Sequence, residues 1–308
     1  MSIRPVKRII EAKPAIEGAG VHLRRAFGFG DTGEYDPFLL LDDFRNDDPA
    51  RYRQGFPWHP HRGIETITYV LAGTVAHGDS LGNEGSIDAG DVQWMTAGSG
   101  IIHQEMPQGD PAGRMHGFQL WANLPSALKM TAPRYQDVQA RDIPEVTDDD
   151  GTRVRVVCGS FWGKKGPVDG IAAEPIYVDV SVPPGKKRSL PVETTRHAFA
   201  YVFAGSGRFA DASEPRPVRT EGIGTVEAAS PVPEVADNRS LVLFDRGDEI
   251  VVQAGEQGIR FLLVSGKPIE EPVAWYGPIV MNTQEELRQA FTEYQNGTFL
   301  KHGNDPAD

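Results

Sequence analysis

The chain is poor in cysteine, in long apolar runs and in basic segments, and each shortage excludes a class of protein. Its 308 residues include one cysteine, Cys158, so no intrachain disulfide can form. Cys158 ends an apolar stretch and is expected to be a small buried side chain. No apolar run reaches the ~18 residues of a membrane helix, and the first residues lack the basic–apolar–small pattern of a signal peptide. We therefore expect a cytoplasmic protein without a membrane-spanning segment.

Positive charge is also scarce. The formal net charge is −12, and the basic runs are short: Arg24–Arg25 and residues 186–188. A protein that binds DNA or an anionic membrane directly presents a basic face that neutralises phosphates. The charge balance therefore disfavours direct binding to nucleic acid or membrane, and it suits a protein partner better.

Glycine and proline are plentiful, with 34 and 24 residues. Many turns between short strands account for such a composition. Between residues 65 and 124, short segments rich in apolar and β-branched residues are separated by Gly, Asp and Asn. Strands at this close spacing predict an antiparallel barrel or sandwich. The earlier segment 38–41 (Phe-Leu-Leu-Leu) is expected to be a buried strand that Asp42 and Asp43 end.

The sequence contains an internal repeat. Residues 69–73 (Tyr-Val-Leu-Ala-Gly) match residues 201–205 (Tyr-Val-Phe-Ala-Gly), and residues 88–91 match residues 245–248 around a Gly-Asp pair. The second copy is longer by 25 residues between these points, and the insertion falls in the Pro-, Glu- and Ala-rich residues 213–238, a loop composition. Two copies of one barrel are the simplest interpretation.

The acidic segment 148–151 (Asp-Asp-Asp-Gly) marks a break near the middle of the chain. Since ~150 residues is a usual domain size, we expect two domains, residues 1–145 and 146–308. The tail at residues 303–308 is expected to be disordered.

A helix is predicted for residues 283–296. Thr283 and Glu286 have the spacing of a capping box, which would begin the helix. Leu287, Phe291 and Tyr294 would share one face of it.

Two short histidine-containing segments carry the candidate chemistry. In the segment His59-Pro60-His61 both imidazoles would face the same side of a strand, because side chains alternate along it. His103 and Glu105 repeat that spacing later in the chain. Three imidazoles and a carboxylate suit one Fe(II), Mn(II), Ni(II), Co(II), Cu(II) or Zn(II) ion, with positions left open for water or substrate. We therefore predict a mononuclear metal site inside the first barrel.

The repeat provides an internal control for this prediction. Aligned on the tyrosines, the second copy has Pro191 and Glu193 at the places of the first histidine pair. Aligned on the Gly-Asp pairs, it has Arg260 and Leu262 at the places of the later His and Glu. The framework thus recurs without the candidate ligands, which argues against a purely structural role for them.

Further motifs accompany these segments: FPWHPHRGIET at residues 56–66, QWMTAG at 93–98, IHQEM at 102–106, FQLW at 118–121 and LLLD at 39–42. Together they resemble the pirin family of bicupins, and the resemblance covers most of the chain, the C-terminal helix included. It implies an all-β fold of two tandem cupin barrels (double-stranded β-helix or jelly roll) followed by a short C-terminal helix.

The resemblance also implies a ligand set. In pirins the first cupin holds a single iron through an HPH segment followed by a His and a Glu two residues apart, and the second cupin is typically metal-free. Fe(II) is therefore implied at His59, His61, His103 and Glu105. Glu65 stands where many cupins have a carboxylate ligand and is the rival to Glu105. Otherwise Glu65 would orient a ligand imidazole or form an ion pair at the rim.

Several more residues near these motifs are candidates for a pocket: Trp58, Trp94, Trp121, His77, His116 and Arg62. The tryptophans would line an apolar pocket for a flat substrate, although such aromatics more often belong to the core. The histidines would approach the metal ligands or make structural hydrogen bonds. The arginine would attract an anionic ligand or pair with an acid.

Pirins resemble quercetinases, and several are credited with quercetin 2,3-dioxygenase activity, in which O2 opens a flavonol. Glu105 would then be the catalytic base that takes the 3-hydroxyl proton, and the metal would bind the flavonolate by Lewis acidity. One alternative is an iron-dependent, redox-responsive protein that binds a protein partner, such as a transcription factor, without turnover. Another is a metal-stabilised barrel with weak, promiscuous activity.

Overall fold

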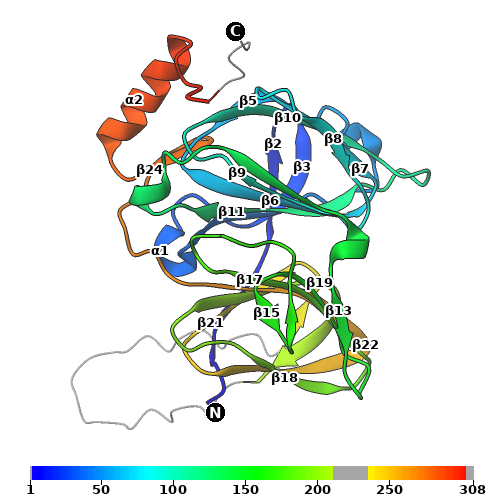
Figure 1. Ribbon diagram of the computed structural model, residues 1–308. Coiled ribbons are helices and arrows are strands. Elements are labelled where there is room, and N and C mark those ends of the chain that lie inside the picture. Colours follow the sequence, from blue (N-terminus) through cyan, green and yellow to red (C-terminus); the bar gives the residue numbers. More distant parts are fainter. Residues whose placement is uncertain (1, 211–234, 303–308) are drawn as a thin grey trace, which may run out of the picture.

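The computed structural model describes residues 2–210 and 235–302. Within these ranges the chain forms two β-barrels, one stacked on the other (Figure 1). The loop predicted for residues 213–238 lies mostly outside the described ranges, and the predicted tail at residues 303–308 lies wholly outside them.

The first barrel consists of two antiparallel sheets. The larger one has seven described strands, in the spatial order β12 (Arg134–Val138), β9 (Val92–Thr96), β6 (Ile64–Ala72), β11 (His116–Asn123), β4 (Phe38–Asp43), β3 (Val21–Phe27) and β2 (Lys13–Glu17). The smaller sheet has the order β5 (Phe56–His61), β10 (Ile101–Gln108), β7 (Thr74–Asp79) and β8 (Glu84–Ile87).

The second barrel is built around one sheet. Its described strands follow the order β1 (Val6–Glu11), β21 (Ser240–Phe244), β19 (His197–Phe209), β22 (Glu249–Gly266), β17 (Ile176–Val182), β14 (Arg153–Cys158) and β13 (Glu145–Thr147), with β18 (Lys187–Pro191) beside β22 and β20 (Ala236–Asp237) beside β19. Two small hairpins complete the strands: β15 (Ser160–Phe161) with β16 (Lys164–Lys165), and β23 (Ala274–Tyr276) with β24 (Ile279–Met281).

Helices contribute little to the described part of the chain. They are α1 (Thr32–Tyr35), α2 (Gln284–Gln295) and short 3-10 turns at Pro49–Arg51, Ser126–Leu128 and Ala140–Asp142. The all-β class with a C-terminal helix is confirmed. No helix within the described ranges has the length and apolar character that crossing a bilayer would need.

The C-terminal helix begins at the predicted cap. The Thr283 hydroxyl accepts from the backbone N–H of Glu286, and the Glu286 carboxylate accepts from the backbone N–H of Thr283. Leu287 is buried against the first barrel's edge, whereas Tyr294 on the same predicted face is 40% exposed.

The strand predicted for residues 38–41 is part of β4, but it does not end at Asp42. β4 continues through Asp42 and Asp43, and both carboxylates are buried. Arg25 pairs with Asp42, and Arg45 pairs with Asp43. Because buried charges are tolerated when they are paired, acidic residues here extend the strand instead of closing it.

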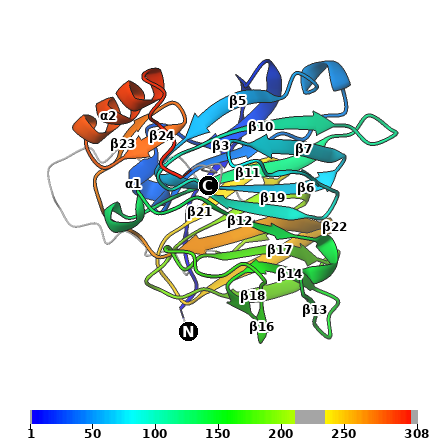
Figure 2. The ribbon, with the colours of Figure 1, turned by 45° about the horizontal axis from the view of Figure 1, so that its top comes forward.

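The two ends of the chain are exchanged between the barrels. β1 lies at the edge of the second barrel, beside β21, and the N-terminus is next to that barrel in Figure 1. At the other end, the segment from β23 to Phe299, here called the C-terminal arm, returns to the first barrel (Figures 1 and 2). The division at residue 145 stays a prediction, since segments from each end pack across it.

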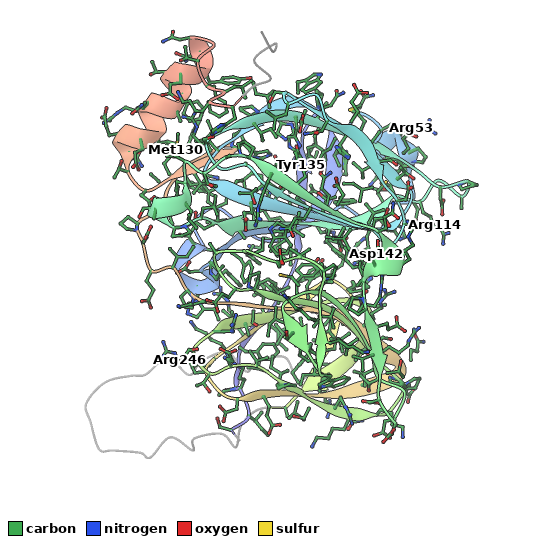
Figure 3. All side chains as sticks on the ribbon, viewed as in Figure 1. Arg53, Arg114, Met130, Tyr135, Asp142 and Arg246 are labelled. Carbon is green, nitrogen blue, oxygen red and sulfur yellow. The ribbon has the colours of Figure 1, made fainter. Side chains whose placement is uncertain are left out.

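One apolar layer joins the barrels. It includes Tyr69 and Phe118 of the first barrel and Phe199 and Tyr201 of the second, and side chains fill the space between the two ribbons in Figure 3. Cys158 lies in the same layer, so the prediction that it is buried is confirmed.

The repeated tyrosines bind across this layer in a reciprocal way. The Tyr69 hydroxyl donates to Asp179 of the second barrel at 2.8 Å, and the Tyr201 hydroxyl donates to Asp43 of the first at 2.8 Å. In each barrel the aspartate lies on the second strand away from the strand of the tyrosine, at the same position along the sheet. The two aspartates therefore occupy equivalent positions in the two barrels. The interface is therefore pseudo-symmetric, as expected for two copies of one barrel.

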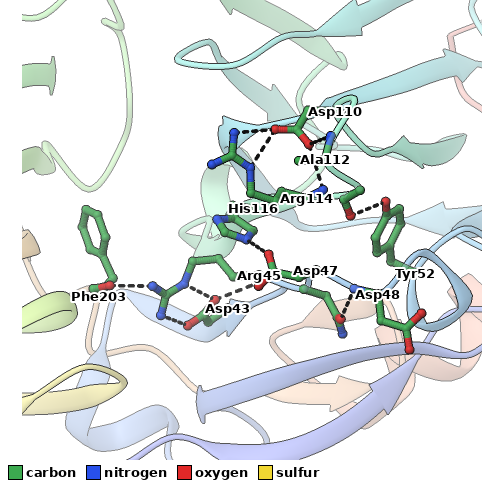
Figure 4. Close-up of polar contacts among 12 residues, drawn as sticks. Asp43, Arg45, Asp47, Asp48, Tyr52, Asp110, Ala112, Arg114, His116 and Phe203 are labelled. Carbon is green, nitrogen blue, oxygen red and sulfur yellow. Dashed lines mark hydrogen bonds and ion pairs between the residues drawn. The ribbon is translucent and has the colours of Figure 1, made fainter.

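Each of these aspartates also pairs with an arginine. Arg260 contacts both oxygens of Asp179, at 2.9 and 2.6 Å. Arg45 contacts Asp43 at 2.7 Å and also donates to the carbonyl of Phe203 in the other barrel (Figure 4). The buried carboxylates thus keep both a cation and a hydroxyl donor.

Replacement of Tyr69 or Tyr201 by phenylalanine should lower the free energy of unfolding by about 1 kcal/mol each. The loss is modest because the aspartate left behind keeps its arginine. Urea unfolding measures it, and Tyr276→Phe is the control, since that ring is 68% exposed and its replacement should stay within about 0.5 kcal/mol of the parent. If the interface variants match the control, the hydroxyls do not stabilise the interface.

Candidate metal centre and cavity

The candidate ligands meet through the pairing of two strands. β5 and β10 are antiparallel, and their register sets His103 opposite His59 and Ile101 opposite His61. β5 is the edge strand of its sheet, a position where a proline such as Pro60 is tolerated. The register shifts between His103 and Glu105, an irregularity that re-aims the end of β10.

The structure brings three of the four predicted ligands together. One nitrogen from each of His59, His61 and His103 lies within 4.8 Å of the other two. Glu105 is not in that cluster but lines the same cavity, where its carboxylate accepts a hydrogen bond from Thr68 at 3.1 Å. Glu105 therefore shares a cavity with His59 and His61 without belonging to the histidine cluster.

The hydrogen bonds around the histidines fit a bound cation. Nδ1 of His59 lies 2.8 Å from the carbonyl of Pro57, and Nδ1 of His61 lies 3.2 Å from the carbonyl of Pro278. With protons on Nδ1, both Nε2 atoms carry lone pairs, and these face each other at 3.1 Å. Both nitrogens of His103 are buried without a partner. A metal ion would take the Nε2 lone pairs of His59 and His61 and one of the two nitrogens of His103.

The electrostatics of the cluster also suit metal binding. Burial, and secondarily the neighbouring imidazoles, lowers the pKa of His61 and of His103 well below the usual value. Burial also lowers the pKa of His59. The rings are thus neutral near pH 7, the form that binds a metal.

Burial has the opposite effect on the nearby carboxyl group. It raises the pKa of Glu105 to about 7, against a smaller lowering by the Thr68 hydrogen bond. The Thr68 hydroxyl is also 2.7 Å from the side-chain amide of Gln119. Because a hydroxyl has one hydrogen, it can donate to Glu105 while accepting from the Gln119 amide, with that amide turned accordingly.

His59, His61 and Glu105 open onto a cavity of about 750 Å³ in the first barrel. Its walls are mainly apolar and include Trp121, whose ring lies edge-on to His61 with centroids 5.1 Å apart. Trp275 and Tyr276 of the C-terminal arm complete the wall near Trp121. Sequence reasoning missed both, because they lie more than 150 residues from the motifs.

Two predicted pocket residues lie on the far side of the sheet. Glu65 is buried, accepts from Thr96 at 2.7 Å and faces Cys158 in the layer between the barrels. Trp94 belongs to that same layer. Neither lines the cavity, so the structure does not bring Glu65 to the histidine cluster as a rival ligand. Among the three predicted tryptophans, Trp121 lines the cavity.

The remaining candidates have structural partners. Trp58 is 53% exposed on the outside of β5, and His116 contacts Asp47 at 2.6 Å near the surface (Figure 4). His77 contacts Gln93 at 3.1 Å. None of these side chains lines the cavity.

Arg62 is buried and pairs with the C-terminal arm, not with a ligand. It donates to the Glu293 carboxylate at 2.7 Å and to the carbonyl of Phe299 at 2.6 Å, and its guanidinium lies over the Phe299 ring. Of the two predicted roles, pairing with an acid is therefore the one that the contacts support. The contact fixes the arm beside the segment that carries His59 and His61.

Family models match both barrels. The model described as Pirin matches residues 20–122, and the model described as Pirin C-terminal cupin domain matches residues 177–300. The chain belongs to the pirin family.

Individual relatives of this pirin agree with that assignment. A pirin-like protein from Caulobacter vibrioides is 44% identical, over 97% of this chain and 100% of its own length. A protein from Pseudomonas aeruginosa whose name gives quercetin 2,3-dioxygenase as a provisional activity is 40% identical, over 96% and 97%. Among solved structures, quercetin 2,3-dioxygenase from Acinetobacter baumannii has a TM-score of 0.83 and 31% identity, over 97% of this chain and 99% of that one.

The second cupin of this pirin has the same strand pairing but an apolar interior. β18 pairs with β22 as β5 pairs with β10, and the side chains that face inward there are Leu190, Ile250, Val252 and Ala254. These aliphatic side chains offer no metal ligand at the places that correspond to the histidines.

The alignment of the repeats by spacing identified the wrong residues of the second barrel as the counterparts of His103 and Glu105. Leu262 pairs with Tyr201 as Phe118 pairs with Tyr69, so Arg260 and Leu262 correspond to β11 and not to β10. The alignment failed because β22 is one long strand that corresponds to both β10 and β11.

A buried lysine holds the segments around the site. The Lys129 ammonium donates to the carbonyl of Gly63 at 2.8 Å, to the Asn123 side chain at 2.6 Å and to the carbonyl of Val280 at 3.0 Å. Its three N–H groups thus match three uncharged acceptors. It joins the turn after His61 to the C-terminal arm.

Replacement of His103 by alanine should abolish tight metal binding, because it removes one of three clustered imidazoles. Nickel(II) at about 100 times its Kd should stabilise the parent by about 2.7 kcal/mol, and this gain should vanish in the variant. Metal content and thermal unfolding measure both effects. His116→Ala is the control, since His116 contacts Asp47 outside the cavity. Equal metal binding by His103→Ala would exclude this site.

Lys129 predicts a pH dependence of stability. Burial lowers the pKa of Lys129 to about 7, whereas in the unfolded chain it stays near its usual value of about 10.4. Between these values the unfolded state binds more protons, so the free energy of unfolding should rise with pH. The free energy of unfolding of the parent should rise more steeply with pH than that of Lys129→Met, by up to about 1.4 kcal/mol per pH unit. Urea unfolding between pH 7 and 10 compares them, and equal slopes would mean that the ammonium stays protonated.

Proposed function

We propose that this pirin is a metal-dependent dioxygenase that opens a flavonol, such as quercetin, with O2. The observation that carries the proposal is the cluster of three neutral imidazoles, each with a nitrogen within 4.8 Å of the other two, beside a largely apolar cavity that His59 and His61 line. The name of the Acinetobacter baumannii relative, quercetin 2,3-dioxygenase, supports the choice of reaction. The reaction would take place in the cytoplasm, the location predicted from the sequence.

One divalent metal ion would be held by His59, His61, His103 and Glu105. Fe(II) is the first choice from the family, and Mn(II), Ni(II), Co(II), Cu(II) and Zn(II) also suit three imidazoles and a carboxylate. When bound, the ion would supply Lewis acidity toward the deprotonated flavonol and an electronic path between the flavonol and O2.

The walls of the cavity would bind and orient the flavonol. Trp121 and Trp275 pack with ring centroids 6.0 Å apart, and both line the cavity, so they offer aromatic surfaces to a flat ring system. The apolar lining would also exclude water from the reacting face of the ligand.

Glu105 would act as the base. Its carboxylate would take the proton of the flavonol 3-hydroxyl, which leaves the negative charge on the flavonol oxygen. The hydrogen bond from Thr68 would hold Oε1 in place, so that the other oxygen turns toward the ligand. In the overall reaction both oxygen atoms of O2 enter the ring-opened product, and one ring carbon leaves as carbon monoxide.

Oxygen uptake tests the proposal. The protein is loaded anaerobically with iron, given quercetin, and then mixed with O2. We expect many turnovers with carbon monoxide formed in step with oxygen consumed, and a loss of at least about 100-fold in the double variant His59→Ala/His103→Ala.

The control for this experiment is His116→Ala, which should keep the parent rate because its side chain lies outside the cavity. If fully loaded protein consumes no oxygen with any of the six metals, the dioxygenase is excluded. That result would favour the alternative of an iron-dependent protein that binds a protein partner without turnover.

A further inference from the structure

A row of polar side chains crosses the floor of the cavity. Thr68 of β6 pairs with Gln119 of β11, Gln119 pairs with Asp42 of β4, and Asp42 pairs with Arg25 of β3. Residues paired in this way face the same side of a sheet, and all four line the cavity. From Thr68 to Arg25 the row spans three interstrand spacings, about 14 Å. It begins beside Glu105, through the Thr68 hydrogen bond, and ends at Arg25 on β3.

The far end of the row is an ion pair on the cavity wall. Arg25 donates through Nε and through a terminal nitrogen to the two oxygens of Asp42, at 2.8 and 2.7 Å. The Asp42 side chain is 7% exposed and the Arg25 side chain is 28% exposed. Glu17, at the edge, contacts Arg25 at 2.8 Å. Since removing an ion pair from water offsets most of its attraction, stability alone is a weak reason for its presence here.

This group still has hydrogen-bonding capacity to offer a ligand. The contacts with Asp42 and Glu17 account for three of the five N–H groups of Arg25. The Asp42 carboxylate accepts two of these hydrogen bonds and has further lone pairs. A hydroxyl group can accept from the guanidinium and donate to the carboxylate at the same time.

The charges of the group decide against an anionic ligand. One guanidinium and two carboxylates, those of Asp42 and Glu17, sum to one negative charge. A carboxylate or sulfate on the ligand would meet net repulsion there, whereas an uncharged phenol would not.

We propose that Arg25 and Asp42, with Glu17 at the edge, form a second subsite that binds a hydroxyl group on an uncharged aromatic ring of the ligand. The inference rests on the proposed function, because it places a flavonol with its 3-hydroxyl end toward Glu105 and a hydroxylated ring toward Arg25. The subsite would select polyhydroxylated flavonols over those with a bare ring system.

Anaerobic binding measurements test the subsite without relying on turnover. Quercetin and 3-hydroxyflavone, which lacks the ring hydroxyls, are titrated into nickel(II)-loaded protein, with quenching of tryptophan fluorescence as the readout. We expect quercetin to bind at least about tenfold more tightly, the equivalent of ~1.4 kcal/mol. In Asp42→Asn this ratio should fall to within about twofold, with the affinity for 3-hydroxyflavone unchanged.

Glu11→Gln is the matched control, since Glu11 pairs with Arg24 outside the cavity. It should keep the parent ratio. Arg25→Gln provides a second variant that should also lose the ratio, and thermal unfolding verifies that each variant is folded.

If both variants fail to fold, the affinities of the parent protein for the two flavonols still test the proposal. Equal affinity of the parent for the two flavonols overturns the subsite, as does a tenfold ratio that survives in a folded Asp42→Asn. Failure of both flavonols to bind overturns the subsite together with the proposed function. A ratio that depends on Asp42, but without oxygen uptake, supports the subsite and excludes only the dioxygenase.

Discussion

The register between β5 and β10 is the constraint on which the proposed metal centre depends. A slip by one residue would turn every side chain of one strand to the opposite face, so His103 would turn away from His59 and His61. β10 is held on both sides, with His103 opposite His59 of β5 and opposite Asp79 of β7. A central strand that is paired twice cannot slip without breaking both ladders, and this keeps the three imidazoles within reach of one ion.

The turn after β5 connects that register to the C-terminal arm. Gly63 has a φ of +77°, and a Cβ atom there would lie 1.9 Å from the carbonyl oxygen of Val280. Glycine at this position therefore allows the arm to approach closely. The approach brings the carbonyl of Pro278 to Nδ1 of His61 and the ring of Trp275 to the cavity wall. The histidine cluster and the cavity wall are thus held by the same segment.

The elements that follow a simple periodicity could be predicted from the sequence. Alternation along a strand was sufficient to place His59 and His61 on one side, and the capping box located the start of α2. Alternation failed for Glu65, which has the same parity as the two histidines. A turn at Gly63 separates Glu65 from the histidines, and β6 belongs to a different sheet from β5. The alternation of side chains along β5 therefore does not continue into β6. The prediction that Asp42 ends its strand was wrong for another reason. The cation that pairs with Asp42, Arg25, lies on a neighbouring strand.

Contacts between distant segments were beyond such reasoning. Two roles were predicted for Arg62. Its contacts with Glu293 and Phe299, which exist only in the folded arm, support pairing with an acid. The same holds for Pro278 and Trp275, which no local pattern connects to the histidines.

The exchange of chain ends has a consequence for biosynthesis. The proposed ligands His59, His61 and His103 leave the ribosome early, but the residues that orient and enclose them lie much later in the chain, at positions 275–299. β1 can likewise pair only after β21 has been synthesised. The first barrel therefore cannot complete its contacts during synthesis of its own half, and the proposed metal centre is enclosed only once residues 275–299 have been made. Enclosure of the proposed metal centre is in this way tied to translation of the chain through residue 299.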